Sequence, residues 1–425
     1  MTRRHLLALA RAAALPAALA ATAVAPAVAA AGTMSATGNQ VTYTAAPGEP
    51  NEVTANGFFD DEDTMMYVLT ISDARPVTIA PGGPCDFDFF GNARCMFPTP
   101  GSFNVQLGDG NDTAIVRNTL ATANAVDGGL GEDRLSTAVA QGRNAISGGE
   151  GNDTIIPDNG AVNPPASDTI SGGSGVDTVD YDREFARRTS GVTVSLDGAA
   201  NDGAPGEQDN VQLDVENLSA TSFSDTLAGG PGPNELLGFG GNDVLSGGGG
   251  ADRLLSHNAN DQLSGGDGND FLEGGSEDDR LDGGAGLDSF SGDETGTANQ
   301  IITGNDTILA RDGVNGELIS CGPGSDSAIV DAGDNVNADP QNACEAVDRA
   351  AARPVATRCK ALKKGAKRDR CAYQAALKKC GKVKRGKKRS RCVRKAKRAY
   401  AVKKCKRVKK SKRAKCIRNA RRVTR

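Results

Sequence analysis

Apolar and polar positions recur with a period of nine over a long stretch of this chain. From residue 220 to residue 291 the sequence divides without a gap into eight nonapeptides. Position eight is Leu in seven of them and Phe in the last, while position six is Asp in seven and Asn in one. Glycine occupies most of positions one, two and four. A period this regular predicts stacked repeats that together bury one row of apolar side chains.

Single copies of the same pattern precede the array. Complete copies start at Gly128, Gly148 and Gly172, and a partial copy starts at Leu107. These starts lie 21, 20 and 24 residues apart, so we expect each copy to form one regular turn of a coil whose opposite side is irregular. After residue 292 the pattern fades, and a last partial copy begins at Cys321.

Alternating β-forming residues also flank the repeats. Residues 41–44, 66–71 and 103–107 are rich in β-formers and are separated by Pro and Gly, which predicts a small β region. Such a region would cover the exposed edge at the end of a coil stack. Residues 192–196 predict one more strand, inside a segment that interrupts the repeats.

The pattern Gly-Gly-x-Gly-x-Asp-x-Leu-x resembles the RTX, or haemolysin-type, calcium-binding repeat. The resemblance covers residues 107–330 and implies an all-β fold, a parallel β-roll or β-solenoid in which two nonapeptides form one coil of 18 residues. It also implies that calcium ions lie between successive turns on the same side. We therefore divide the chain into a signal peptide (1–31), an N-terminal β cap (32–106), a calcium-binding β-roll (107–300), a C-terminal cap (301–350) and a tail (351–425).

The residue types suit a hard cation. Glycine permits positive φ and a tight turn that exposes carbonyl oxygens, Asp adds carboxylate oxygens, and calcium takes six to eight oxygen ligands. The leucine at position eight would point inward from a short strand. The expected aspartate ligands are Asp112, Asp133, Asp153, Asp177, Asp225, Asp243, Asp252, Asp261, Asp270, Asp279 and Asp288. The expected glycine ligands are Gly247, Gly248, Gly250, Gly265, Gly266, Gly268, Gly283, Gly284 and Gly286.

Successive nonapeptides face opposite sides of such a roll, so the array has two rows of turns. The first row starts at Gly229, Gly247, Gly265 and Gly283 and keeps all its glycines. The second row starts at Ala220, Gly238, Ser256 and Gly274, and it carries Thr221, Phe239, His257, Ala259 and Glu277 where glycine is expected. We predict a strong calcium ladder at Asp252, Asp270 and Asp288, and a weaker or partly filled one at Asp225, Asp243, Asp261 and Asp279. A solenoid whose aspartates only cap turns is the alternative.

Charge and composition make calcium necessary for order in this interpretation. Residues 220–291 hold 13 acids against two arginines, and aromatic residues make up 4% of the chain with no Trp. Without metal, such an array repels itself and has little core. Calcium binding would then contribute directly to folding, and weak extracellular calcium modules bind with dissociation constants of ~0.1–1 mM.

The amino terminus predicts export. Residues 1–31 combine arginines, a long Ala/Leu stretch and small residues suited to cleavage, which predicts a signal peptide. This signal is of the Sec or twin-arginine type, and an uncleaved membrane anchor is the alternative. Export places the ten cysteines in an oxidising compartment. We expect Cys85 to pair with Cys95 across a hairpin loop and Cys321 with Cys344. The protein should be secreted or extracellular, with surface association as an option.

The carboxyl-terminal tail is strongly basic. Residues 359–425 carry 32 Lys and Arg with one acid, whereas residues 1–358 have a net charge of −35. Three units beginning and ending in cysteine predict short helices stapled by Cys359–Cys371, Cys380–Cys392 and Cys405–Cys416, with a disordered tail as the alternative. Counterion release would bind this tail to an anionic cell-envelope polymer or lipid surface. Only Tyr373 and Tyr400 could stack on bases, so we expect no specific nucleic-acid binding.

Sequence motifs of enzymes are absent. The chain has two histidines, and neither the H-E-x-x-H nor the G-x-S-x-G pattern occurs. We therefore predict no catalytic residues and a monomeric, secreted calcium-binding protein held to anionic surfaces by its tail. A structural or adhesive surface protein that calcium only stiffens is the first alternative, and an enzyme with an unrecognised site is the second.

Overall fold

A computed structural model describes most of residues 32–349. The residues outside the description are 1–31, 49, 61–65, 75, 89–90, 121, 138–139, 141, 158–166, 182–187, 294–303, 340–341 and 350–425. The predicted signal peptide and the basic tail, with its three proposed disulfides, therefore lie outside the described residues. No helix within the described part of the chain is long and apolar enough to cross a membrane.

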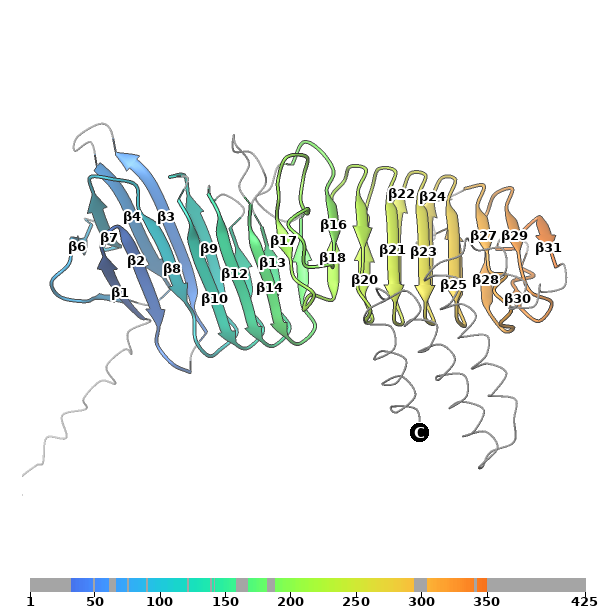
Figure 1. The fold of residues 1–425 in the computed structure, drawn as a ribbon, viewed down its shortest axis with the longest axis horizontal. Helices are drawn as coiled ribbons and strands as arrows, with labels where there is room; N and C mark the ends of the chain where they lie inside the picture. Colours follow the sequence, from blue (N-terminus) through green and yellow to red (C-terminus); the bar gives the residue numbers. More distant parts are fainter. Residues whose placement is uncertain are drawn as a thin grey trace, which may run out of the picture.

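The described residues form three sheets, which we call A, B and C (Figure 1). Sheet A contains, in spatial order, β17 (Asn210–Val211), β14 (Thr169–Ser174), β12 (Asn144–Glu150), β10 (Asn124–Leu130), β8 (Ser102–Gln106), β2 (Gln40–Ala45), β1 (Gly32–Thr37) and β5 (Val77–Ile79). Sheet B contains β30 (Asn335–Val336), β28 (Leu318–Ser320), β26 (Ser289–Asp293), β24 (Phe271–Ser276), β22 (Arg253–Asn258), β20 (Glu235–Leu237), β18 (Asn217–Ser219), β15 (Thr178–Asp180), β13 (Thr154–Ile156), β11 (Arg134–Ser136), β9 (Thr113–Asn118), β3 (Glu52–Asp60), β4 (Met66–Asp73), β7 (Ala93–Phe97) and β6 (Cys85–Phe87). Sheet C contains β16 (Thr193–Ser195), β19 (Thr226–Ala228), β21 (Val244–Gly249), β23 (Gln262–Asp267), β25 (Arg280–Ala285), β27 (Thr307–Leu309), β29 (Ser327–Ile329) and β31 (Ala346–Asp348).

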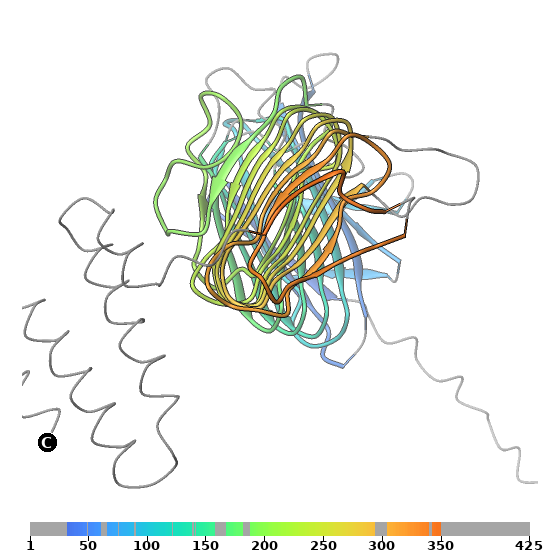
Figure 2. The ribbon, with the colours of Figure 1, turned by 90° about the vertical axis from the view of Figure 1, so that its right-hand side faces the viewer.

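The repeats wind as a parallel β-solenoid. In sheet C, Leu245 pairs with Leu263 and Leu263 with Leu281, so each coil advances the chain by two nonapeptides. The same parallel register holds in sheet B, where Leu254 pairs with Leu272. Viewed along the rod, the coils lie one behind another as flattened loops (Figure 2). The all-β, parallel fold class expected from the nonapeptide period is confirmed.

The core is a narrow double row of apolar side chains between facing sheets. Position eight supplies the buried residues, because alternate residues of a strand point to opposite faces. In sheet B this row includes Leu218, Leu236, Leu254, Leu272, Phe290 and Ile319, and in sheet C it includes Val194, Leu227, Leu245, Leu263, Leu281 and Ile308, all at most 3% exposed. Burying each such side chain stabilises the fold by about 1.5–3 kcal/mol.

The amino-terminal strands use antiparallel pairing and larger side chains. Strand β1 pairs with β2 and β3 with β4 in antiparallel fashion, whereas β2 and β3 join the first coil through parallel pairing with β8 and β9. Four of the largest fully buried side chains, Met34, Tyr43, Phe103 and Tyr181, lie before residue 182. Residues 41–44 and 66–71 lie within the strands expected there. The rod therefore has its bulkiest core at this end.

The predicted disulfide between Cys85 and Cys95 is confirmed. The two cysteines occupy directly paired positions on the antiparallel strands β6 and β7. These strands form one edge of sheet B, so the bridge closes the hairpin at the amino-terminal end of the rod.

Sheet B runs the whole length of the rod, but its partner changes from sheet A to sheet C. The change occurs at the interrupting segment, where β17 ends sheet A and β16, inside the predicted strand 192–196, begins sheet C. Asp202, 1% exposed, joins the two sheets: its carboxylate accepts the Ser195 amide at 2.7 Å and the Val211 amide at 2.9 Å. The interruption thus exchanges one face of the solenoid without breaking the other.

The coils continue beyond the point where the glycine pattern fades. Strands β27, β29 and β31 extend sheet C, and β28 and β30 extend sheet B, all through parallel pairs. The predicted Cys321–Cys344 disulfide is present in this part. The proposed segment boundaries themselves stay predictions.

Candidate metal-binding turns

An aspartate stands directly before each strand of sheets B and C within most of the array. Asp252 precedes β22, Asp270 precedes β24 and Asp288 precedes β26. The Asp252 amide donates a hydrogen bond to Asp270 Oδ1 at 2.9 Å, and the Asp270 amide donates to Asp288 Oδ1 at 3.0 Å. One oxygen of each carboxylate is therefore fixed by the backbone of the preceding coil.

This aspartate ladder runs along the N-terminal ends of the strands of sheet B and of sheet C. We call these two rows of strand ends the sheet B edge and the sheet C edge. On the sheet B edge, the amides of Asp112, Asp133 and Asp153 donate to Asp133, Asp153 and Asp177. On the sheet C edge, the amides of Asp225, Asp243 and Asp261 donate to Asp243, Asp261 and Asp279. The structure thus arranges the eleven aspartates singled out in the sequence into two edges. All eleven are at most 3% exposed.

The second carboxylate oxygen of these aspartates is buried without a hydrogen bond in ten of the eleven. The oxygens concerned are the Oδ2 atoms of Asp112, Asp133, Asp153, Asp177, Asp243, Asp252, Asp261, Asp270, Asp279 and Asp288. The exception is Asp225, whose Oδ2 accepts hydrogen bonds from the amide and hydroxyl of Thr221 at 2.9 Å each. A buried acceptor without a partner is costly, so a row of such oxygens favours the binding of a cation or a proton.

Eight of the ten free oxygens lie beside a first-position glycine, and at five of these turns a carbonyl oxygen of the next coil lies close to the same glycine. A Cβ atom added to Gly265 would lie 2.4 Å from Asp270 Oδ2 and 2.7 Å from the Gly283 carbonyl oxygen. On the sheet C edge, a Cβ on Gly274 would lie 2.3 Å from Asp279 Oδ2. At these glycines a carboxylate and a carbonyl oxygen from neighbouring coils therefore converge at a place that a side chain would fill.

The glycines at positions two and four of the first row are also required by the backbone geometry. Gly248, Gly266 and Gly284 have φ of 96°, 112° and 89°, a region that L side chains rarely adopt. At position four, a Cβ on Gly268 would lie 1.4 Å from the Gly250 carbonyl oxygen, and a Cβ on Gly286 would lie 1.2 Å from that of Gly268. The stacked turns approach each other too closely for any side chain there.

The second row keeps the same backbone path without the same glycines. Phe239, His257, Ala259 and Glu277, four of the five residues that replace glycine there, are the described non-glycine residues with positive φ, between 71° and 82°. Holding an L residue in this region costs about 1–2 kcal/mol. The Phe239 and His257 rings stack with centroids 5.7 Å apart, which offsets part of this strain. The predicted weakness of calcium binding in this row stays a prediction.

Burial makes these carboxylates hard to ionise without a cation. Burial is the main cause that raises the pKa of Asp279 to about 9 and that of Asp243 to about 8, and neighbouring aspartates add to it. In the first row, burial raises the pKa of Asp252 and of Asp288 to about 6. Hydrogen bonds from the preceding coil's amides act in the opposite direction. The array therefore takes up protons or metal ions readily near neutral pH.

The donor set fits calcium better than a softer metal. Within the described residues, no group of three or more His, Cys, Asp or Glu side chains is placed to hold a metal by itself. Carboxylate oxygens must therefore be supplemented by other oxygens, and the turns supply carbonyl groups. Mixed carboxylate and carbonyl coordination is typical of calcium, whereas zinc and copper prefer nitrogen and sulfur.

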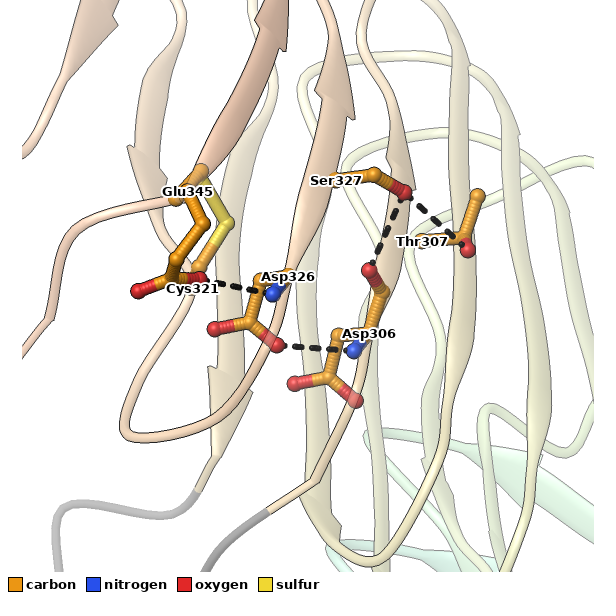
Figure 3. Close-up of a disulfide and its surroundings, with 7 residues drawn as sticks. Asp306, Thr307, Cys321, Asp326, Ser327 and Glu345 are labelled. Carbon is orange, nitrogen blue, oxygen red and sulfur yellow. Dashed lines mark hydrogen bonds between the residues drawn. A yellow bond between two sulfur atoms is a disulfide. The ribbon is translucent and has the colours of Figure 1, made fainter.

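The sheet C edge contains three acids that the sequence reasoning did not single out as ligands. The Asp279 amide donates to Asp306 Oδ1 at 2.9 Å. Figure 3 shows the next two steps, in which the Asp306 amide donates to Asp326 Oδ1 at 2.8 Å and the Asp326 amide to Glu345 Oε2 at 2.7 Å. A signal for Asp306 was present, because the sequence Gly-Asn-Asp-Thr-Ile occurs both at 151–155 and at 304–308.

Comparison with known protein families identifies the repeats. Four segments match the RTX calcium-binding nonapeptide repeat: residues 140–161, 166–183, 219–254 and 257–290. Comparison with curated proteins gives no match. The matched segments contain free carboxylate oxygens from both edges, all except those of Asp112 and Asp133, so the repeat resemblance inferred from the nonapeptides is confirmed.

Proposed function

We propose that this chain, in which four segments between residues 140 and 290 match the RTX calcium-binding nonapeptide repeat, is a secreted protein whose solenoid becomes ordered as calcium binds. RTX repeats bind calcium ions, and the proposal concerns what that binding does here. Its main support is the row of buried, unpaired Oδ2 oxygens on the position-six aspartates. Calcium supplies the positive charge that these oxygens lack, and binding to the folded form alone stabilises that form.

The proposed ligands are the aspartates and turn glycines of each row. In the first row, Oδ2 of Asp252, Asp270 and Asp288 would contribute together with carbonyl oxygens of the glycines at positions one, two and four. The equivalent turns at Asp112, Asp133, Asp153 and Asp177 extend the sheet B edge. In the second row, the strained turns and the hydroxyl and amide already held by Asp225 support weaker binding.

Circular dichroism during calcium titration tests the proposal. We expect the β signal to rise between calcium-free buffer and millimolar calcium, because the metal-free array carries 13 acids against two arginines. Asp270→Asn keeps an oxygen for the Asp252 amide but removes the charge, so it should weaken the response. Asp267→Asn, an exposed position in the same nonapeptide, is the matched control. An unchanged spectrum at 10 mM calcium would count against calcium-coupled ordering.

The basic tail supports a second part of the proposal, attachment to anionic surfaces. The tail's 32 Lys and Arg would bind phosphate or carboxylate polymers by counterion release, with affinity that falls steeply as salt rises. Sedimentation with anionic and with neutral vesicles, for the full chain and for a variant lacking 359–425, tests this. Equal retention of both proteins would contradict it.

A structural or adhesive protein, in which calcium only stiffens a rod that is already folded, is the second candidate. It is favoured by the aspartate ladder, since its backbone-to-carboxylate hydrogen bonds hold neighbouring coils together without metal. The two candidates differ in the calcium-free state, which is ordered in this one and expanded in the first. We propose no catalytic residues, and turnover of a substrate in a broad panel would overturn that.

A further inference from the structure

Three glutamates occupy the ladder position that aspartate holds elsewhere, and one of them behaves differently. Glu216 Oε2 accepts the Asp177 amide at 2.9 Å, and Glu345 Oε2 accepts the Asp326 amide at 2.7 Å. Glu317 is 0% exposed, yet neither of its carboxylate oxygens has a hydrogen bond. Its backbone remains in register, because the Leu318 amide donates to the Asp288 carbonyl oxygen at 3.2 Å. Only its side chain departs from the ladder, because its carboxylate accepts no hydrogen bond from a backbone amide.

The free carboxylate of Glu317 lies among other acids near the carboxyl-terminal end of sheet B, where β28 and β30 lie at the orange end of the rod (Figure 1). Burial, followed by the charges of Asp334, Asp312, Asp288 and Asp331, raises the pKa of Glu317 to about 9. The cluster therefore concentrates negative charge around one buried group.

Backbone amides already engage most of the neighbouring carboxylates. Asp334 Oδ1 accepts the Gly316 amide at 3.1 Å, and its Oδ2 accepts the Asp331 amide. Asp331 Oδ2 accepts the Gly313 amide, whereas Asp331 Oδ1 is buried without a hydrogen bond. Among these groups, four buried oxygens have no hydrogen bond: two on Glu317, one on Asp331, and Oδ2 of Asp288, which belongs to the aspartate ladder.

The basic side chain that contacts this cluster does not neutralise it. Arg349 donates from its guanidinium to the carbonyl oxygen of Asp334 at 3.2 Å, not to a carboxylate. Two stacked loops, 312–317 and 331–334, therefore surround the unpaired oxygens with negative charge. An oxygen-seeking divalent cation is the ligand that this arrangement favours.

We propose that Glu317 and Asp331 bind one calcium ion between these two loops, at a site separate from the glycine turns. The segment matched by the nonapeptide repeat ends at residue 290, and the loop 312–317 has no glycine pair at its start. Carboxylates take the place of the turn glycines as anchors, and carbonyl groups and water complete the coordination. Asp288, the last ladder aspartate of the first row, adjoins Glu317, so the test reads the array and this site separately.

Calcium content and local protection of the full-length protein test the proposal. Equilibrium dialysis with radioactive calcium gives the number of bound ions, and hydrogen exchange read by mass spectrometry gives the protection of peptides covering 312–336. Glu317→Gln preserves shape and removes charge, and Asp331→Asn keeps an acceptor for the Gly313 amide. Each variant should lose one ion and the calcium-dependent protection of 312–336. The double variant should lose the same single ion.

Controls separate this site from the array. Asp267→Asn, which removes the charge of an exposed acid outside the ladder, should keep every ion. Peptides within 247–290 report the array independently, so failure of the array to bind calcium would appear there and leave 312–336 as an unaffected readout. Because burial raises the pKa of Glu317 to about 9, calcium-free folding at neutral pH must protonate this carboxyl, a cost that Gln lacks; Glu317→Gln should therefore raise the calcium-free melting temperature. Unchanged ion number and unchanged protection of 312–336 in Glu317→Gln would overturn the proposal.

Discussion

A single methyl group at Gly268 should separate the structural and metal-binding roles of the turns. In Gly268→Ala the new Cβ would lie 1.4 Å from the Gly250 carbonyl oxygen, whereas real contacts of this kind stay beyond 3.0 Å. One turn must therefore move by at least about 1.6 Å relative to the other. Gly249→Ala is the matched control, because its Cβ would meet nothing closer than 3.8 Å and its φ is not positive.

The size of the effect follows from what the displacement breaks. The Gly268 amide donates to the Ala285 carbonyl at 3.0 Å, and the Gly250 amide donates to the Asp267 carbonyl at 2.9 Å. Two half-exposed backbone hydrogen bonds contribute about 0.5–1.5 kcal/mol each, so the calcium-free protein should lose about 1–3 kcal/mol. Metal sites tolerate ligand shifts of only about 0.2 Å, so one calcium site should also be lost. At calcium concentrations near 100 times Kd this removes about 2.7 kcal/mol more.

Urea denaturation of both variants, in chelator and in saturating calcium, measures the two contributions. We expect Gly249→Ala to match the unmodified protein in both buffers. Gly268→Ala should lose more stability in calcium than in chelator. If its loss is equal in the two buffers, the turn does not bind calcium and its glycines serve packing alone.

Three further predictions concern pH, the core and the carboxyl-terminal disulfide. The folded-state pKa of Asp279, about 9, lies above its unfolded value of 3.8, so the folded state binds more protons than the unfolded state. The calcium-free stability should therefore fall as pH rises from about 4 toward 9. Urea midpoints at pH 5 and pH 8 in chelator would measure this fall. Leu272→Ala, at a side chain 0% exposed, should cost about 2–5 kcal/mol by chemical denaturation, whereas Leu318→Ala, 56% exposed, should stay within about 0.5 kcal/mol. Replacing Cys321 and Cys344 by Ser opens a loop of 23 residues and should cost about 3 kcal/mol in thermal unfolding, while unchanged unfolding would show that the bridge contributes nothing.

The regular features of this rod could be predicted because one physical requirement repeats in each nonapeptide. A residue facing the core must be apolar, so Leu263 and Leu281 reveal the register directly. A turn that brings a carboxylate against a carbonyl of the next coil needs both Asp and Gly, which identifies Asp270 and Gly265. The placement of every position-six aspartate on one of two edges follows from that register alone.

The irregular features could not be predicted because their sequence carries no period. Asp202 joins sheets A and C through two amides, but it lies in a loop with no repeat to align it. The coil containing Glu317 has an acid at position six and Ile319 at position eight, but of the pattern's glycines it keeps only Gly313, at position two. Phe239 and His257 show that the backbone of a turn can persist after its glycines are replaced, since neighbouring coils impose the path.

The two ends of the rod differ in the size of their buried side chains, which are largest at the amino-terminal end. Met34, Tyr43 and Phe103 are wholly buried at the amino-terminal end, where they provide apolar area that no metal is needed to assemble. Beyond residue 220 the core narrows to single aliphatic side chains and Phe290, beside rows of unpaired carboxylates. As calcium is withdrawn, we expect order to recede from the carboxyl-terminal coils toward the amino-terminal end. The ordered length of the particle, measured by small-angle scattering, would then serve as a gauge of the calcium concentration around it.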